Sequence, residues 1–174
     1  MTDREPVETT NLDRYGNAPI PWSRAREILA VGSFGPSVTF FLGTVGADGR
    51  PHVAGVGAVW YEGDLYFNSG LTTRKARDLA RDPRCTIAAR LPGLDVTFDG
   101  RASVVEDADL VGRVAEVFRA GGWPAEVEGV LFTGPYSAPT AGPPPWRLFR
   151  FVIDTALGLA VVEPFGASRW RFAA

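Results

Sequence analysis

The sequence predicts a mainly β protein whose antiparallel sheet closes into a barrel. Apolar residues alternate with polar residues, or form short apolar runs, in about seven segments of strand length. Most of these segments are joined by turn signals such as Gly46–Gly49, and only two or three short helical patterns interrupt them. Closure into a barrel is the expected arrangement because it removes exposed strand edges.

Length and composition indicate one globular domain. The chain has 174 residues, of which 45% are hydrophobic, and this is enough to bury a sizeable core. Residues 1–19 are polar and show no periodicity, so we expect a flexible N-terminal arm before a single domain at residues 20–174. The net charge of −2, with acidic and basic residues interspersed, argues against nucleic acid as the main partner.

The scarcity of histidine and cysteine excludes several kinds of site. His52 is the one histidine and Cys85 the one cysteine, so the chain has no Cys/His metal cluster and no internal disulfide framework. A Ser-His-Asp triad would need His52, which we interpret as a strand residue near a turn rather than as an acid–base group. No apolar run reaches about 18 residues, and no secretory signal is visible. We therefore expect a cytoplasmic protein with no metal and no membrane span.

Two helices and a series of strands are expected around a central basic segment. The first helix covers residues 19–30 and has an apolar face that includes Trp22. A longer helix runs from its N-cap, Asp107, to about Ala120. The expected strands are residues 37–45, 50–60, 65–69, 84–90, 95–105, 146–155 and 157–162, with a last short one at 168–172.

The strand expected at residues 50–60 has an unusual face. Gly55 and Gly57 share that face with Val53 and Val59. Two glycines on one face are typical of a bend at a barrel corner. They also leave room for a flat molecule to lie against the backbone, and both interpretations stay open.

The chain is organised around a strand, a polar turn and a helix. The strand at residues 65–69 leads into a helix at residues 73–81, whose apolar stripe follows helical spacing. Thr72 or Thr73 is the expected N-cap, and Pro83 closes the helix.

The start of this helix carries cations where they are unfavourable. Arg74 and Lys75 lie in the first turn and Arg77 follows, and Lys75 is the one lysine beside 17 arginines. Cations at a helix N-terminus cost roughly a few tenths of a kcal/mol each, unless an anion binds there. Free backbone N–H groups, threonine hydroxyls and these cations would together hold a phosphate. A solvated basic helix face explains the pattern equally well.

Three segments, in this order, resemble one protein family. They are residues 42–53, 65–67 and 73–83, which read Leu-Gly-Thr-Val-Gly-Ala-Asp-Gly-Arg-Pro-His-Val, Leu-Tyr-Phe and Thr-Arg-Lys-Ala-Arg-Asp-Leu-Ala-Arg-Asp-Pro. Together they resemble the pyridoxamine 5'-phosphate oxidase-like FMN-binding split barrels and, within that superfamily, the flavin/deazaflavin-dependent oxidoreductases. The resemblance covers roughly residues 20–172.

This resemblance implies an antiparallel Greek-key split barrel, a homodimer, and a cofactor in a groove between the subunits. The implied cofactor is FMN or the deazaflavin coenzyme F-420 (8-hydroxy-5-deazaflavin), both of which carry a phosphate. In the family, the basic helix start binds that phosphate and neighbouring strands flank the ring. The implied phosphate contacts are Thr73, Arg74, Lys75 and Arg77. The implied ring contacts are Val56, Gly57, Ala58, Val59 and Ser69.

The sequence departs from a true pyridoxamine phosphate oxidase. Such an enzyme has a C-terminal substrate motif with an Arg-x-His-Asp-Arg core, whereas this chain has no histidine after His52. We therefore do not expect oxidation of vitamin B6. We expect an oxidoreductase in which the cofactor carries the chemistry and hydride passes between it and a small electron-poor organic substrate. The alternative is a non-catalytic protein that binds or carries the cofactor, or haem, on the same fold.

Several aromatic side chains have more than one possible role, and the catalytic residues stay unknown. The candidates for a proton donor, besides water, are Tyr61, Tyr66 and Tyr136. Three tryptophans are core or dimer contacts, or one of them stacks on the cofactor ring: Trp60, Trp123 and Trp146.

Two further segments are expected near the site. A loop at residues 133–145 contains five prolines, and loops of this length are often lids, so we expect it to cover the substrate side together with Trp22 of the first helix. Arg169 and Arg171 in the last strand either hold a cofactor tail or belong to a surface edge strand.

Overall fold

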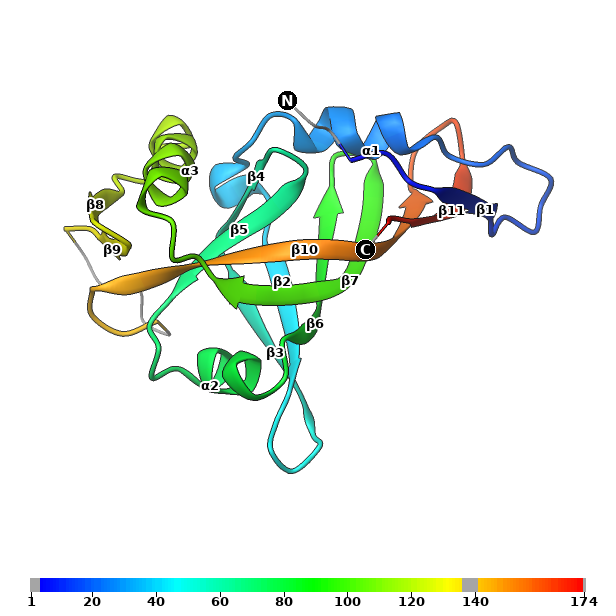
Figure 1. Cartoon of the computed structure of the whole chain (residues 1–174). Helices are drawn as coiled ribbons and strands as arrows, with labels where there is room; N and C mark the ends of the chain where they lie inside the picture. Colours follow the sequence, from blue (N-terminus) through cyan, green and yellow to red (C-terminus); the bar gives the residue numbers. More distant parts are fainter. Residues whose placement is uncertain (1–3, 136–140, 174) are drawn as a thin grey trace.

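A computed structural model describes residues 4–135 and 141–173 (Figure 1). The helices are α1 (Trp22–Leu29), α2 (Arg74–Arg81) and α3 (Ala108–Ala120), with a short 3-10 helix at Gly35–Ser37. The strands are β1 (Glu8–Asn11), β2 (Phe40–Val45), β3 (Pro51–Val56), β4 (Ala58–Tyr61), β5 (Asp64–Ser69), β6 (Arg84–Leu91), β7 (Leu94–Val104), β8 (Glu126–Glu128), β9 (Leu131–Thr133), β10 (Trp146–Ala160) and β11 (Gly166–Arg171).

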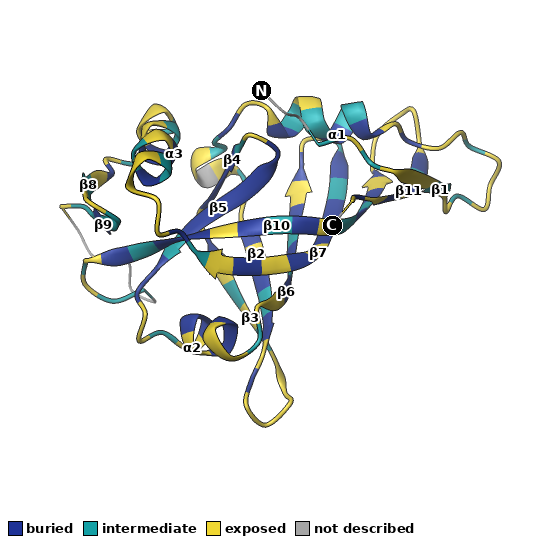
Figure 2. Ribbon diagram, viewed as in Figure 1, coloured by how far each residue is buried: buried dark blue, intermediate teal, exposed yellow. Residues whose placement is uncertain are grey.

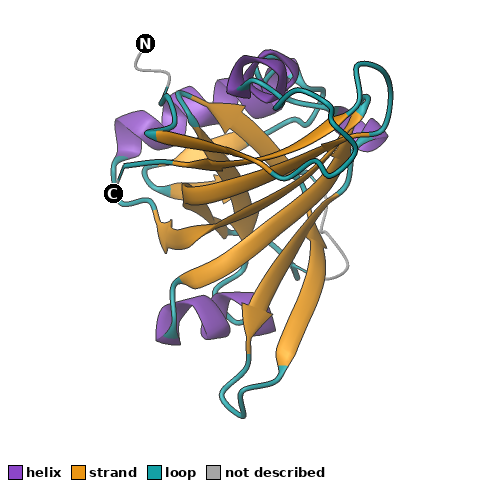
Figure 3. Cartoon of the chain, turned by 90° about the vertical axis from the view of Figure 1, so that its right-hand side faces the viewer, coloured by secondary structure: helices purple, strands orange, loops and turns teal. Residues whose placement is uncertain are grey.

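The strands of the described chain form one large antiparallel sheet, which confirms the prediction of a mainly β split barrel. The main path through the sheet is β1-β11-β10-β7-β6-β2-β3, and the β4–β5 hairpin joins it because β5 pairs with β10. Strand β10 also pairs with β7, β9 and β11, so it connects most of the sheet. Helices α1 and α2 lie at opposite ends of the sheet (Figures 1 and 3).

Two hydrophobic clusters fill the interior. The larger one lies inside the barrel and includes the fully buried side chains of Phe67, Phe98 and Phe151. The smaller one packs α3 against β9 and the start of β10, through residues such as Phe118 and Trp146. In Figure 2 the buried residues of α3 lie on the side of the helix that faces the sheet. The fold is therefore a barrel with a smaller lobe built on α3.

Two expected strand boundaries are wrong. The segment at residues 50–60 is not one strand, because the ladder breaks at Gly57 between β3 and β4. The two strands expected at residues 146–155 and 157–162 are one continuous strand, β10, which contains a bulge between Ile153 and Thr155. A bulge changes the pairing register without ending the strand, so polarity alone misplaces the break. Strands β8 and β9 were not predicted, since three residues are too few to show a period.

The prediction of an irregular N-terminal arm is wrong for four of its residues. Strand β1 pairs with β11 in a register that matches Glu8 with Arg171. Upstream, the Arg4 guanidinium donates a hydrogen bond of 3.3 Å to the Ile153 carbonyl oxygen. Strand β11 therefore lies between β10 and β1, and the interpretation of Arg169 and Arg171 as members of an edge strand is also wrong. Long-range pairing of this kind leaves no local signal in a polar segment.

Candidate functional site

The turn between β5 and α2 is built by hydroxyl groups. Thr73 is the N-cap of α2, and its Oγ1 accepts a hydrogen bond of 3.3 Å from the Ala76 backbone N–H. The Ser69 hydroxyl, fully buried at the end of β5, lies 2.9 Å from the same Oγ1. A side chain that caps a helix satisfies one of its free N–H groups and determines where the helix begins. The expected helix at residues 73–81 is confirmed to within one residue, and of the two expected caps, Thr72 and Thr73, the structure uses Thr73.

The first turn of α2 presents donors that have no partner among residues 4–135 and 141–173. The backbone N–H groups of Arg74 and Lys75 make no hydrogen bond there, as is usual for the first residues of a helix. The Lys75 side chain makes no hydrogen bond or ion pair within the same residues, although only 5% of the residue is exposed. Burial lowers the pKa of its amine from the ordinary value of 10.5.

The Lys75 side chain is mostly buried, but its amine is not fully shielded from solvent and has no partner among the described residues, so it is available to an anionic ligand. Removing an ammonium group from water costs free energy unless a counter-charge or hydrogen-bond acceptors replace the water. A phosphate at the start of α2 would supply both and would also accept from the free N–H groups. Lys75 therefore fits the phosphate end of the implied cofactor.

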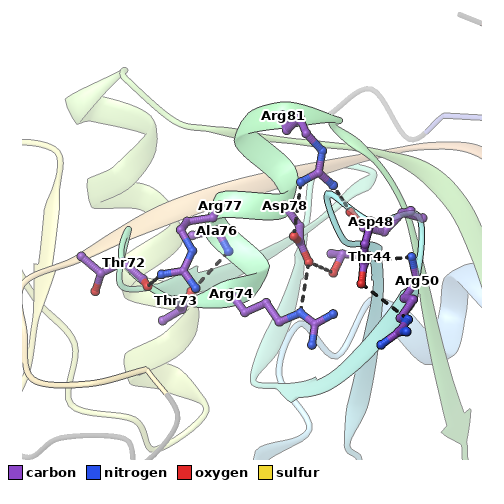
Figure 4. Close-up of polar contacts among 11 residues, drawn as sticks. Thr44, Asp48, Arg50, Thr72, Thr73, Arg74, Ala76, Arg77, Asp78 and Arg81 are labelled. Atoms are coloured by element: carbon purple, nitrogen blue, oxygen red, sulfur yellow. Dashed lines mark hydrogen bonds and ion pairs between the residues drawn. The ribbon is translucent and has the colours of Figure 1, made fainter.

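Two of the three arginines of α2, Arg74 and Arg81, lie on either side of a buried carboxylate (Figure 4). Asp78 is 5% exposed and accepts a hydrogen bond of 3.0 Å from the Thr44 hydroxyl of β2. Arg74 lies 3.9 Å and Arg81 3.7 Å from its carboxylate oxygens, one turn away on either side. Arg77 instead donates a hydrogen bond of 2.8 Å to the Thr72 carbonyl oxygen. The half-exposed side chain of Arg74 therefore points away from the helix start, toward Asp78 and the β2–β3 turn, whereas Arg77 turns back toward the loop before α2 (Figure 4).

Asp78 and Thr44 were not recognised in the sequence as parts of the site. A helical signal existed, because Asp78 lies three residues after Lys75 and one before Leu79, on the buried stripe of α2. Nothing in the sequence identifies Thr44 as its partner, since the two residues are brought together by the packing of α2 against β2.

Removal of this carboxylate is expected to loosen α2. Asp78→Ala should lower the free energy of unfolding by about 2 kcal/mol, because hydrogen bonds to charged groups contribute about 1.5–3 kcal/mol. Urea denaturation followed by tryptophan fluorescence measures this change. Asp109→Ala, which removes an exposed carboxylate from the first turn of α3, should change stability by less than about 1 kcal/mol. Equal effects of the two substitutions would show that Asp78 does not anchor the helix.

A cavity of about 340 Å³ lies between the break that separates β3 from β4 and the C-terminal end of α3. One wall is the strand break with the start of β4, namely Gly57, Ala58 and Val59, and β5 contributes Asn68. Opposite them lie the aromatic residues Phe118, Trp123 and Trp146. Asn68 precedes Thr73 by five residues, a separation of at most about 18 Å along the chain. The cavity and the helix start are thus within the span of one extended molecule.

The predicted site residues divide into two groups. Gly57, Ala58 and Val59 line the cavity, and an added Cβ on Gly57 would meet no heavy atom within 4 Å. Their contact with a cofactor ring stays a prediction. Val56 is buried in the barrel core and Ser69 packs on Thr73, so neither lines the cavity. The strand breaks at Gly57, as expected for a bend at a barrel corner, and the break leaves free space. The binding of a flat molecule in that space stays a prediction.

The comparisons with known proteins agree with this architecture. A family model described as pyridoxamine 5'-phosphate oxidase matches residues 30–141, which is more than half of the chain. The chain belongs to the pyridoxamine 5'-phosphate oxidase-like split-barrel family. A search of curated proteins found no match.

Solved structures of this split-barrel family share the fold at low sequence identity. A pyridoxamine 5'-phosphate oxidase-related, FMN-binding protein from Nostoc punctiforme has 18% identity and a TM-score of 0.57, over 87% of this chain and 90% of that one. A 5-nitroimidazole antibiotic resistance protein from Bacteroides thetaiotaomicron has 13% identity and a TM-score of 0.56, over 96% and 92%. A haem-binding protein from Mycobacterium smegmatis has 19% identity and a TM-score of 0.60, over 86% of this chain but 58% of that one.

Within this split barrel, the predicted covering role of Trp22 is wrong. Trp22 is 4% exposed and packs edge-on against Trp170 and Phe172, with ring centroids 5.3 and 4.9 Å away. Trp60 lies in the same core, 6.4 Å from Trp22. The helical periodicity correctly placed Trp22 on the apolar face of α1, but that face covers the barrel interior. Part of the proline-rich loop, residues 136–140, lies outside the described residues.

Tyr66 and Cys85, two other titratable groups within residues 4–135 and 141–173, do not form a reactive centre. Burial raises the pKa of Tyr66 to about 12, and its ring packs on Tyr61 with centroids 6.3 Å apart. Burial likewise raises the pKa of the Cys85 thiol to about 12, so it is not a ready nucleophile. Tyr136, the third candidate donor, lies outside the described residues.

Within the described chain there is no group of three or more His, Cys, Asp or Glu residues suited to a metal. No helix of the described chain is long and apolar enough to cross a bilayer.

Proposed function

We propose that the protein is an oxidoreductase that transfers hydride between bound FMN or coenzyme F-420 and a small electron-poor organic substrate. The observation that carries this proposal is Lys75, which is mostly buried, has no partner among the described residues and lies in the first turn of α2. The N-cap of that helix, Thr73, follows the cavity residue Asn68 by five residues. In the proposal, the phosphate is held by Thr73, Arg74 and Lys75, together with the free N–H groups of α2. Arg77 adds positive charge from the loop side. Gly57, Ala58 and Val59 lie along the ring.

In this proposal the cofactor supplies the hydride chemistry, and the chain supplies position and surroundings. The capped turn from Ser69 to Thr73 holds the donors of α2 in place before a ligand arrives. The aromatic side of the cavity excludes water, which strengthens the electrostatic contacts that remain. The raised pKa makes Tyr66 a poor proton donor at neutral pH, so we assign the proton to solvent.

The experiment that tests the proposal is a fluorescence titration of the apo protein with FMN and, separately, with coenzyme F-420. Micromolar or tighter binding of one of them is expected. Turnover of the reduced, bound cofactor with an added quinone then distinguishes an enzyme from a carrier. If neither FMN nor coenzyme F-420 binds, the assignment of a cofactor site to the start of α2 is wrong.

We also propose a homodimer, in a cytoplasmic setting, with the cofactor groove between the subunits. On the outer face of the β2–β3 hairpin, Phe41, Val45 and Val53 are 48%, 46% and 61% exposed. Exposed apolar side chains gathered on one strand surface are typical of an interface.

Light scattering at micromolar concentration should give the mass of a dimer, and Phe41→Glu should give a monomer. The control Tyr15→Glu changes an exposed residue of the arm and should leave the dimer intact. A monomeric wild-type protein would contradict the proposal.

The second candidate is a non-catalytic cofactor- or haem-binding protein. It is favoured by the fold similarity to the haem-binding protein from Mycobacterium smegmatis. His52, the one imidazole available, lies on β3 and lines a separate hollow with charged residues such as Asp82 and Arg84. A haem held by His52 would therefore lie outside the aromatic cavity. A Soret band after addition of haem, lost in His52→Ala, would support this candidate.

A further inference from the structure

The turn between β5 and α2 is centred on one backbone carbonyl group. The Gly70 carbonyl oxygen accepts hydrogen bonds from the Thr73 backbone N–H at 3.2 Å and from the Thr73 hydroxyl at 2.9 Å. The oxygen of that hydroxyl also accepts from the Ala76 backbone N–H and so caps α2. The position of the first free N–H groups of the helix therefore depends on where Gly70 is held.

The segment that leads into β10 lies against this turn (Figure 1). Gly70 is buried, and an added Cβ there would stand 2.6 Å from the Ala141 carbonyl oxygen, closer than real Cβ atoms come. Two backbone segments can approach this closely because glycine has no side chain. Ala141 also packs against the hydrophobic cluster built on α3. A displacement of Ala141 therefore either displaces the turn or breaks their contact.

One buried side chain holds this segment in place. Trp146, the first residue of β10, is 1% exposed, and its indole N–H donates a hydrogen bond of 3.1 Å to the Gly142 carbonyl oxygen. A buried N–H group without an acceptor is unfavourable, so the indole keeps Gly142, and with it Ala141, in one position. The same ring lines the aromatic cavity beside Trp123, with ring centroids 5.8 Å apart. Trp146 thus connects the cavity with the turn before α2.

We infer that Trp146 is a positioning residue for the cofactor phosphate: its indole N–H, acting through Gly142 and Ala141, holds the turn at Gly70 where the α2 donors meet the ligand. This inference rests on the proposed function. Trp146 acts through the backbone and not by contact with the phosphate, because its N–H group is used by Gly142. Loss of this hydrogen bond releases the segment from the turn, so the phosphate contributes less to the affinity while the cavity keeps its aromatic wall.

The test measures how much the phosphate contributes to cofactor affinity. FMN and riboflavin share one ring system and FMN alone carries a phosphate, so the ratio of the riboflavin to the FMN dissociation constant isolates that contribution. Coenzyme F-420 and its phosphate-free chromophore give the corresponding ratio if the deazaflavin is the compound that binds. Trp146→Phe keeps an aromatic ring and removes the N–H group. Fluorescence titration of this variant should give a ratio about fivefold lower than in the wild type, as expected for the loss of one hydrogen bond.

Trp123→Phe is the matched control. The Trp123 ring lines the same cavity, but its indole N–H makes no hydrogen bond within residues 4–135 and 141–173. This variant should change the affinity for both compounds by the same factor and leave their ratio as in the wild type. An unchanged ratio in Trp146→Phe, or an equal fall of the ratio in Trp123→Phe, would overturn the inference.

Gly70→Ala tests the same contact from the other side. The added Cβ would displace the Ala141 carbonyl oxygen, so the ratio should fall by a similar factor. In the double variant the two losses of binding free energy should be less than additive, because both substitutions break one contact. Fully additive losses would overturn the inference.

The wild-type ratio separates this inference from the proposed function. A ratio near one would show that no phosphate is held, which overturns the phosphate site of the proposed function together with the inference. A high ratio that Lys75→Met lowers and Trp146→Phe does not would overturn the inference alone.

Discussion

Replacement of Lys75 by methionine is expected to weaken cofactor binding at least tenfold, or about 1.4 kcal/mol, while the protein stays folded. The Lys75 side chain is mostly buried and its amine has no partner among the described residues, so its charge opposes folding and favours an anionic ligand. The methionine side chain is similar in length to that of lysine, carries no charge and packs well among apolar groups. The variant should therefore bind FMN or coenzyme F-420 poorly and melt at a higher temperature than the wild type. Lys75→Glu should weaken binding at least as much, again without loss of the fold.

The control for this prediction is Arg113→Met. Arg113 is an exposed cation of α3 without a partner in the described chain, so its loss removes one positive charge away from the site. Fluorescence titration should show unchanged cofactor affinity in this control. An unchanged cofactor affinity in Lys75→Met would show that the start of α2 does not bind the cofactor phosphate.

We also expect Lys75 to make cofactor affinity and the stability of the folded protein depend on pH. Burial lowers its pKa from 10.5, so the folded protein releases this proton at a lower pH than the unfolded chain. The penalty of the buried charge is complete at neutral pH and disappears as pH rises through the lowered pKa toward 10.5. The difference in melting temperature between Lys75→Met and the wild type should therefore shrink in alkaline solution. Cofactor affinity of the wild type should fall over the same range, because the neutral amine no longer pairs with phosphate.

Substitution of alanine for Gly100 is expected to be the most destabilising small change in the barrel. Gly100 lies on β7, and an added Cβ would stand 2.1 Å from the Val152 carbonyl oxygen and 3.0 Å from the Phe151 ring. The oxygen belongs to the backbone of β10, next to the bulge, so it cannot move away as a flexible side chain would. Overpacking of this severity costs about 3 kcal/mol, at the upper end of the usual range.

Thermal and urea unfolding measure this loss. A destabilisation of about 3 kcal/mol corresponds to a fall in melting temperature of roughly 6–12 °C for a chain of this size. Gly112→Ala is the matched control, because an added Cβ on that helical glycine meets nothing within 4 Å. It should stabilise the protein by about 0.5–1 kcal/mol. A loss below about 1 kcal/mol in Gly100→Ala would mean that β7 and β10 can separate locally and that the bulge is not constrained.

The local elements of the site could be predicted from the sequence alone. The Thr73 cap, the apolar stripe and Pro83 determine α2 within a few residues, so its boundaries are confirmed. The cationic helix start is also a local pattern, and its assignment to a phosphate stays a prediction. The mainly β class follows from strand-length apolar segments and turn signals, which depend on near neighbours in the chain.

Only the tertiary structure decided which residues meet. Gly57 and Trp123 line one cavity although 66 positions separate them, and Asp78 meets Thr44 across the packing of α2 on β2. Strand β1 is formed by pairing with β11 at the other end of the chain. The burial of Lys75 likewise cannot be read from its neighbours, because a basic helix face is usually solvated. Propensity and capping act between residues close in sequence, whereas burial, cavities and strand partners arise when distant segments pack, and that packing is what distinguishes this site from a plain basic helix.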